Sequence, residues 1–282
     1  RRAADRRIHG ASRCSVLPVA AQERSLMLTV SRARFAYGER VALRDVSIEI
    51  GETALVALAG PNGSGKSTLL KLIARVVAPS SGDVQFMGKS LADWNAKAYA
   101  QQTGYLPQDL ETSFPMRALD VVVSGRAPFL TRFGFESDAD YRQAASALAI
   151  CDASYLAERY LDEMSGGERK RVFLARVLAG RPKLVLLDEP LSALDIAHAQ
   201  QFSKLMREIV DRTGASVLFA SHDLNWAAAY SDRIVVMQDG SIAADLPPAE
   251  LMRPEVVQRF FGFEAESVVV NGRPWLVPRV QQ

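Results

Sequence analysis

The chain has 282 residues, of which 48% are hydrophobic and 23% are charged, and its formal net charge is +2. This length and apolar content suffice for one large domain or for two lobes with separate cores. The longest apolar runs are far shorter than the roughly 18 to 20 residues of a membrane-spanning helix, so we expect any membrane role to come through a partner.

Most of the positive charge lies in the first 26 residues, which hold six arginines against two acidic residues. The formal charge of residues 27–282 is therefore −2, which argues against a nucleic-acid partner. Residues 1–26 also lack apolar periodicity, and we expect a disordered extension there, with an Arg-rich targeting peptide as the alternative. The two cysteines, Cys14 and Cys151, match no metal or redox spacing and are expected to be reduced.

The ordered domain is expected to start near Met27. Residues 28–50 read as two strands joined by a turn at Gly38 and Glu39, and the second strand alternates apolar with polar residues. Tyr37 ends the first strand, where its ring could pack on the sheet or contact a ligand.

The next stretch is a phosphate-binding loop. An apolar run at residues 54–59 precedes the sequence GPNGSGKST, and residues 68–75 are predicted to be helical. This pattern and context let backbone N–H groups and a helix N-terminus face one anion. The predicted anion site comprises Gly60, Pro61, Asn62, Gly63, Ser64, Gly65, Lys66, Ser67 and Thr68. In this motif the lysine neutralises the β- and γ-phosphates and the Ser67 hydroxyl binds Mg²⁺.

Residues 109–165 lose strand character and show helical periodicity at 119–124 and 139–150. Gln108, just before them, follows a short predicted strand and read alone is a solvated loop amide. The early part of this segment is rich in large apolar residues near arginines. These residues could form either a partner surface or the core of a small lobe, and they are Phe114, Met116, Phe129, Phe133 and Phe135.

Three further features lie in the second half of the chain. Ser165, Gly166 and Gly167 begin a predicted helix, as an anion-binding N-terminus or as an ordinary cap. Asp188 and Glu189 end an apolar strand, at the sheet edge where ligands bind in open α/β folds, so a cation is implied. His222 also follows a strand and read alone is structural or exposed. A C-terminal hairpin is expected around an Asn271–Gly272 turn.

Taken together and in this order, these features resemble the six-part signature of the ATP-binding-cassette ATPases. The matching stretches are the phosphate loop, Gln108, MSGGE at 164–168, LVLLDEP at 184–190, SALD at 192–195 and His222. The resemblance implies an α/β fold: a P-loop NTPase core with a mixed sheet, an antiparallel β subdomain and an inserted α-helical subdomain. It divides the chain into the extension at 1–26, the ATPase domain at 27–263 and the hairpin extension at 264–282. Within the ATPase domain, 27–108 and 166–263 form the core with its β subdomain, and 109–165 form the helical subdomain.

The resemblance also implies a role for each site residue, with ATP and Mg²⁺ as cofactors. Lys66 and the loop N–H groups hold the triphosphate, and Tyr37 stacks on adenine. Ser67 and Gln108 bind Mg²⁺ directly, while Asp188 holds it through water. Glu189 is the base or the residue that positions water, and His222 contacts the γ-phosphate. In a head-to-tail dimer of two copies, Ser165, Gly166 and Gly167 complete the ATP site of the other copy, and Asp195 links the two sites.

Three stretches narrow the resemblance to ATPases that drive import of iron chelates, haem or cobalamin, namely residues 124–134, 194–198 and 222–240. The implied partners are integral membrane permease subunits and, indirectly, a substrate-binding protein. The implied place is the cytoplasmic face of the inner or plasma membrane, with Gln108 linking nucleotide state to the permease. The alternatives are the ATPase of another permease, such as one for molybdate, and an ATPase of this family without a membrane partner.

Overall fold

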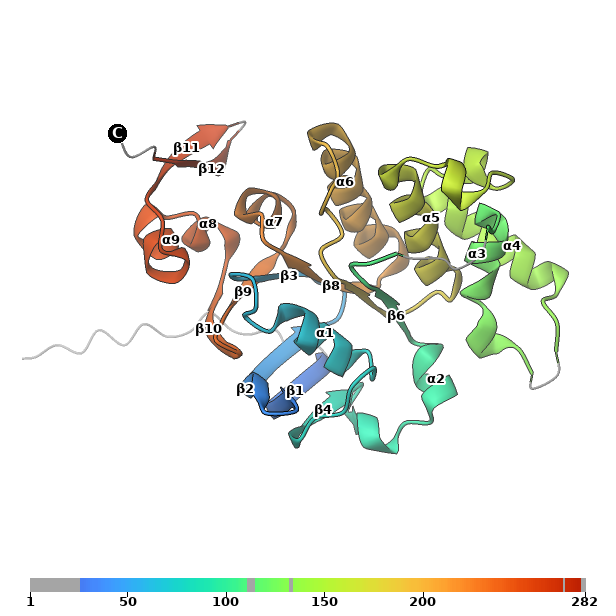
Figure 1. Cartoon of the computed structure of the whole chain (residues 1–282), viewed down its shortest axis with the longest axis horizontal. Helices are drawn as coiled ribbons and strands as arrows, with labels where there is room; N and C mark the ends of the chain where they lie inside the picture. The colour runs from blue at the N-terminus through green and yellow to red at the C-terminus, as the bar shows by residue number, and fades with distance from the viewer. Residues whose placement is uncertain (1–25, 111–114, 132–133, 271, 280–282) are drawn as a thin grey trace, which may run out of the picture.

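A computed structural model describes residues 26–110, 115–131, 134–270 and 272–279 (Figure 1). The predicted N-terminal extension as far as residue 25, Cys14, Phe114, Phe133 and Asn271 lie outside these ranges. Of the described helices, none is long and apolar enough to cross a membrane.

A mixed sheet forms the centre of the described chain, in the strand order β10-β9-β3-β8-β7-β6. Five of its strands run parallel, and β10 lies antiparallel to β9 at one edge. The strands are β3 (Leu55–Ala59), β6 (Thr103–Leu106), β7 (Leu184–Leu187), β8 (Ser216–Ser221), β9 (Arg233–Gln238) and β10 (Ser241–Leu246). The three strands β3, β7 and β8 are buried along their whole length, as expected for parallel strands covered on both faces.

The second described sheet is antiparallel, with the order β2-β1-β4-β5. It contains β1 (Leu26–Tyr37), β2 (Arg40–Gly51), β4 (Ser81–Phe86) and β5 (Lys89–Ser90). Helix α1 (Lys66–Ile73) lies between this sheet and the mixed sheet, and its apolar residues share one core with both (Figure 1). The predicted mixed sheet and antiparallel β subdomain are confirmed.

Helices cover the other face of the mixed sheet (Figure 1). Alternate residues of β3 enter the two cores, Leu55 and Ala57 on the side of α5 (Gly166–Ala179), and Val56 and Leu58 on the side of α1. The helices that contact the sheet are α5, α6 (Ile196–Thr213) and α7 (Leu224–Tyr230). Helices α3 (Ala118–Ser124) and α4 (Asp138–Ile150) pack on α5, on its side away from the strands (Figure 1). The inserted helical part of the predicted fold is confirmed, since α3 and α4 fall between β6 and α5 in the sequence.

The apolar residues that precede α4 have different environments. Met116 packs against the core on this face, and Phe129 lies under the Arg126 guanidinium, 3.8 Å from the ring centre to Cζ. Phe135 is 91% exposed. Met116 and Phe129 thus fit the expectation of a packed core, whereas Phe135 fits the expectation of an exposed surface.

Several short helices have no counterpart in the sequence-based assignment. Each spans three to eight residues, and three carry a proline in their first turn. The α-helices among them are α2 (Ala96–Ala100), α8 (Pro248–Leu251) and α9 (Pro254–Phe261). The 3-10 helices are η1 (Leu91–Asp93), η2 (Ala127–Phe129), η3 (Ser154–Leu156) and η4 (Leu161–Glu163).

The C-terminal hairpin, β11 (Ala265–Val270) and β12 (Arg273–Pro278), docks on α7. The Asn225 side chain donates to the Leu276 carbonyl at 3.1 Å and accepts from the Leu276 N–H at 2.8 Å. The rings of Trp226 and Trp275 meet edge to face with their centres 5.9 Å apart. The hairpin is thus held by both polar and aromatic contacts.

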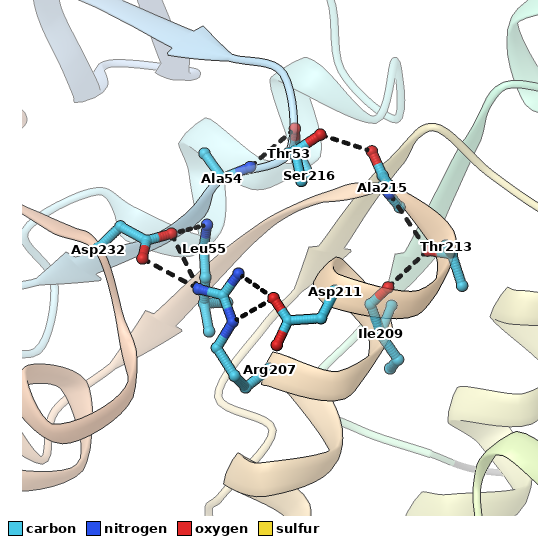
Figure 2. A network of polar contacts seen from close by, with 11 residues as sticks. Thr53, Ala54, Leu55, Arg207, Ile209, Asp211, Thr213, Ala215, Ser216 and Asp232 are labelled. Carbon is cyan, nitrogen blue, oxygen red and sulfur yellow. Dashed lines mark hydrogen bonds and ion pairs between the residues drawn. The ribbon is translucent and has the colours of Figure 1, made fainter.

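A polar network fastens α6 to the amino ends of β3 and β9 (Figure 2). Asp232 precedes β9 and accepts the Leu55 N–H at 2.8 Å. Arg207 of α6 donates to both Asp232 oxygens, at 3.0 and 3.1 Å, and to Asp211 at 2.7 and 3.0 Å. This network lies at the edge of the sheet opposite the phosphate loop, which follows the carboxyl end of β3.

Candidate active site

A cavity of about 390 Å³ opens where β3 runs into α1. This volume falls in the range of small-molecule sites. The cavity brings together residues from the antiparallel sheet, the phosphate loop, the segment after β6 and the segment after β7. Its lining comprises Tyr37, Arg40, Val41, Ala42, Asn62, Gly63, Ser64, Gly65, Lys66, Ser67, Thr68, Gln108 and Glu189.

Two glycines are required by the backbone of the loop. Gly60 has φ +150°, and a Cβ there would lie 2.2 Å from the Met237 carbonyl oxygen. Gly65 has φ +104°, and its Cβ would lie 2.8 Å from the Ala42 oxygen. Gly65 caps α1, which starts at Lys66, two residues earlier than the sequence predicts. The earlier start places Lys66 and Ser67 in the first helical turn, at the positive end of the helix dipole.

The Lys66 ammonium is buried beside the loop. Its Nζ donates to the Gly60 carbonyl at 2.8 Å and to the Pro61 carbonyl at 3.0 Å. Burial lowers the pKa of Lys66, and the nearby carboxylates of Glu189 and Asp188 oppose this shift. Two of its three N–H donors are used among the described residues, so one remains for an anionic ligand.

Ser67 and Asp188 meet at one side of the cavity. The Ser67 Oγ donates to Asp188 Oδ1 at 2.8 Å, and the Tyr105 hydroxyl lies 3.4 Å from Oδ2. Asp188 is only 3% exposed, and burial raises its pKa. A hydroxyl and a carboxylate in contact form an all-oxygen donor set, the kind that Mg²⁺ prefers. The buried Ser64 Oγ has no hydrogen-bond partner among the described residues.

Glu189 occupies the border of two cavities. It lines the loop cavity and also a neighbouring one of about 240 Å³ that includes His222. Its side chain is 14% exposed, and its Oε2 lies 3.5 Å from His222 Nδ1. Glu189 has φ +46°, a left-handed backbone that is uncommon for a residue with a side chain. The structure thus joins Glu189 to both the loop and His222, whereas His222 does not line the loop cavity.

Two predicted site residues that lie outside the phosphate loop in the sequence, Gln108 and Tyr37, are also at the cavity. Gln108 lines it, and Tyr37 lines it with 48% of its surface exposed. The rings of Tyr37 and Phe35 meet edge to face with their centres 4.8 Å apart. Tyr37 therefore packs against the sheet and still has exposed surface that a ligand could contact. Arg40, Val41 and Ala42 also line the cavity but were not predicted, because they begin β2 and carry no motif that could have marked them.

The remaining predicted site residues lie together, away from this cavity. Ser165 caps α5, and Glu168 accepts from the Ser165 N–H and Oγ, both at 2.9 Å. Asp195 caps α6 and accepts from His198. A Cβ on Gly167 would lie 3.0 Å from the His198 ring. Ser165, Gly166, Gly167 and Asp195 are absent from the described lining of the loop cavity.

Comparisons with known proteins identify the family of the chain. The sequence model of the ABC transporter family matches residues 43–192. The hemin import ATP-binding protein HmuV of Rhodococcus jostii (strain RHA1) is 39% identical, over 87% of this chain and 84% of that protein. The petrobactin import ATP-binding protein FpuC of Bacillus anthracis is 33% identical, over 90% of this chain and 93% of that protein.

Solved structures show the same fold. An inward-facing metal-chelate type ABC transporter aligns with a TM-score of 0.79 over 91% of this chain and 98% of that chain, at 24% identity, which supports the fold alone. The ATP-binding cassette MJ0796, in a dimeric post-hydrolysis state bound to ADP and Pi, aligns with a TM-score of 0.69 at 26% identity, over 79% of this chain and 99% of that chain. The family match over more than half of the sequence and the identity to both relatives over most of their length show that this chain belongs to the ABC transporter family, as one of its ATP-binding, ATP-hydrolysing subunits.

Proposed function

We propose that this chain is the ATPase motor of an importer for iron chelates of the haem or siderophore class. The observation that carries the ATPase part is the convergence of Lys66, Ser67 and Glu189 on one cavity, with the buried Asp188 bonded to Ser67. The names of its relatives support the cargo, since one is a hemin and the other a petrobactin import subunit.

The residues of the cavity have distinct proposed roles. Lys66 and the backbone N–H groups of residues 60 and 62–68 bind the triphosphate, and Tyr37 supports adenine through its free face. Ser67 and Gln108 hold Mg²⁺, with Asp188 acting through water. When bound, the metal neutralises charge on the phosphate oxygens. The buried Asp188 carboxylate is well suited to such a cation, which would relieve the cost of its desolvation.

Glu189 is the proposed catalytic carboxylate. It borders the loop cavity, where it can orient a water molecule toward the γ-phosphorus and accept its proton as the P–O bond forms. The bridging oxygen then leaves on ADP, and inorganic phosphate is released. His222 lies 3.5 Å from Glu189 and would hold the γ-phosphate and the carboxylate in register.

A second copy of the chain is the proposed partner in catalysis. In the described residues the start of α5 and Asp195 lie outside the loop cavity of their own chain. A head-to-tail dimer would bring Ser165, Gly166 and Gly167 of each copy to the ATP of the other, with Asp195 linking the two sites. The dimeric cassette bound to ADP and Pi supports such an assembly.

The further proposed partners are integral membrane permease subunits, and through them a substrate-binding protein. This assembly would hold the chain at the cytoplasmic face of the membrane. We also propose the division into a core with a β subdomain at 27–108 and 166–263, a helical subdomain at 109–165 and a hairpin extension at 264–282.

The decisive experiment reconstitutes the chain with candidate permease and substrate-binding subunits from the same organism. ATP-dependent uptake into proteoliposomes is measured for haem, a ferric siderophore, cobalamin and molybdate. A second set of proteoliposomes carries the Glu189→Gln variant in place of the wild-type chain, as the control without hydrolysis. ATP-dependent uptake of haem or the siderophore supports the proposal. Uptake of molybdate or cobalamin alone would show that the proposed cargo is wrong. The transport role itself would be overturned if the chain, purified from its own cells, were recovered only with partners that are not membrane proteins.

A further inference from the structure

The segment between β7 and α6 has an unusual backbone. Glu189 and Ala193 are both non-glycine residues with positive φ, +46° and +58°. Such left-handed residues cost conformational energy and persist where the surroundings fix them. The three residues between them therefore need an external support if the Glu189 side chain is to keep one direction.

Lys170 donates hydrogen bonds to this segment. It lies in α5, five positions after the Ser165 cap, and its Nζ donates to the Pro190 carbonyl at 3.0 Å. The same ammonium also donates to the Ser192 carbonyl and to Ser192 Oγ, the latter at 3.2 Å. An ammonium has three N–H donors, and these acceptors match that number. All of them lie between the two left-handed residues.

The electrostatics of the contact favour a cation. Burial lowers the pKa of Lys170, while the Glu189 carboxylate acts in the opposite direction and favours the charged form. A half-buried ammonium whose donors all face this segment is thus partly compensated by the carboxylate that the segment carries.

We infer that Lys170 is a positioning residue for ATP hydrolysis, because its ammonium fixes the 190–192 backbone that aims Glu189 and ties it to the helix beginning at Ser165. The inference rests on the proposed catalytic role of Glu189. In the proposed dimer, a shift of α5 upon contact with the partner's ATP would reach Glu189 of the same chain through this one side chain.

The test is Lys170→Met in the purified full chain, since methionine keeps an apolar stem but removes every donor. Misplacement of a catalytic group by about 1 Å costs on the order of a hundredfold in rate, so we expect kcat to fall by about tenfold to a hundredfold. KM for ATP and nucleotide affinity should stay within about twofold, because the phosphate loop is untouched. A kcat within about twofold of the wild type, or a raised KM with unchanged kcat, would overturn the inference.

Arg171→Met is the matched control. Arg171 is the next residue of α5, its side chain is 15% exposed, and it donates to Gln201 and to the Cys151 carbonyl at 3.5 Å. It therefore contributes to helix packing without a described contact to residues 189–193. We expect its kcat to stay within about twofold of the wild type. An equal loss in both variants would mean that general packing of α5 matters and not the Lys170 contact.

A double variant separates positioning from an independent effect. On a Glu189→Gln background, Lys170→Met should lower the remaining single-turnover rate by less than about twofold, because the group it positions is already gone. A loss as large as in the wild-type background would refute the inference. If Lys170→Met does not fold, Lys170→Gln keeps two donors on a shorter chain, and a smaller loss of kcat in the same direction is expected.

The two proposals fail in different ways. Near-normal turnover in Glu189→Gln would remove the catalytic role of Glu189, whatever Lys170 does. Loss of turnover in Glu189→Gln with full activity in Lys170→Met would leave the catalytic role intact and reject only the positioning role.

Discussion

Ser67 donates a 2.8 Å hydrogen bond to Asp188, although 121 positions separate the two residues in the sequence. One belongs to the first turn of α1 and the other follows β7, so the pair exists only because the parallel strands β3 and β7 end at the same edge of the sheet. The contact places a hydroxyl and a buried carboxylate where a divalent cation can be shared.

Asp188→Asn should therefore raise the Mg²⁺ concentration needed for half-maximal ATPase activity. The amide keeps the size of the side chain but loses the charge that orients the metal's ligands, and loss of such a partner typically costs about 10- to 100-fold in metal affinity. The measurement is a Mg²⁺ titration of turnover at saturating ATP. Tyr105→Phe, which removes only the 3.4 Å hydroxyl contact to Asp188, is the control and should shift the midpoint less. An unchanged midpoint in Asp188→Asn would exclude the metal role.

Glu189→Gln should bind ATP normally and hydrolyse it very slowly. The amide cannot accept a proton from water, and loss of a general base typically lowers the rate by about 10² to 10⁴. Because the ATP-bound state then persists, a dimer should accumulate with ATP but not with ADP, which size-exclusion chromatography with light scattering can detect. Hydrolysis near the wild-type rate would remove Glu189 from its proposed role.

Gly65→Ala should weaken nucleotide binding by more than about tenfold. Alanine at φ +104° is strained by about 1 to 2 kcal/mol, and its Cβ would sit 2.8 Å from the Ala42 oxygen, so the loop and β2 must move apart. Gly88→Ala is the control, since Gly88 has φ +74° but open space around it. Titration with a fluorescent ATP analogue compares the two. Equal affinities would show that the close approach of Gly65 to β2 is unimportant for binding.

The sequence predicts the half of the cavity that local patterns encode. A buried strand, a glycine-rich loop and a helix can be recognised within one stretch, and the acids after β7 follow from strand ends that share a sheet edge. Arg40, Val41 and Ala42 could not be predicted, because they reach the cavity through docking of the antiparallel sheet, which no local pattern describes. The placement of His222 beside Glu189 rather than beside the loop is likewise set by tertiary packing.

Other features were also not predicted, because local sequence patterns do not encode contacts between distant elements. The contact of Lys170 with Pro190 and Ser192 joins residues from two elements, and a lysine in a helix gives no sign of its partner. The hairpin is visible from its Asn–Gly turn, but its attachment to Asn225 is not. Helices α8 and α9 were not predicted, because the prolines in their first turns resemble loop residues in the sequence.

We expect Asp140 to make the free energy of unfolding depend on pH below about pH 4. Its carboxylate accepts from the Ser137 Oγ at 2.7 Å, the Ser137 N–H at 3.0 Å and Arg126 Nε at 2.9 Å. The bonds from Ser137 first, and then that from Arg126, lower the pKa of Asp140 from its ordinary value of 3.8 to about 2. Because the pKa is depressed in the folded state, this stabilisation is full above pH 3.8 and is lost as pH falls toward 2.

The measurement compares thermal midpoints of the wild type and Asp140→Asn between pH 6 and pH 2. The wild type should be more stable at pH 6, and the difference should shrink below pH about 4. Asp138→Asn is the control, since Asp138 is exposed in the same first turn of α4 and belongs to no described ion pair. A difference between Asp140→Asn and the wild type that is constant over this range would contradict the assignment.

Asp232→Ala should destabilise the protein without changing the chemistry of the cavity. The change removes the acceptor of the Leu55 N–H and a partner of Arg207 at the amino edge of the sheet (Figure 2). An unsatisfied buried donor costs about 1 to 3 kcal/mol. The free energy of unfolding should fall by that amount, and the thermal midpoint by roughly 2 to 4 °C for each kcal/mol.

Asp211→Ala is the matched control, because it also removes a partner of Arg207 but leaves the Leu55 N–H bonded to Asp232. An exposed helical pair of this kind contributes only about 0.3 to 0.5 kcal/mol, so its midpoint should move little. Both variants should keep the wild-type kcat at 20 °C below their midpoints, since the network lies at the edge of the sheet remote from Glu189. Equal destabilisation by both variants would show that the ion pairs of Arg207, and not the bond to β3, fasten α6 to the sheet.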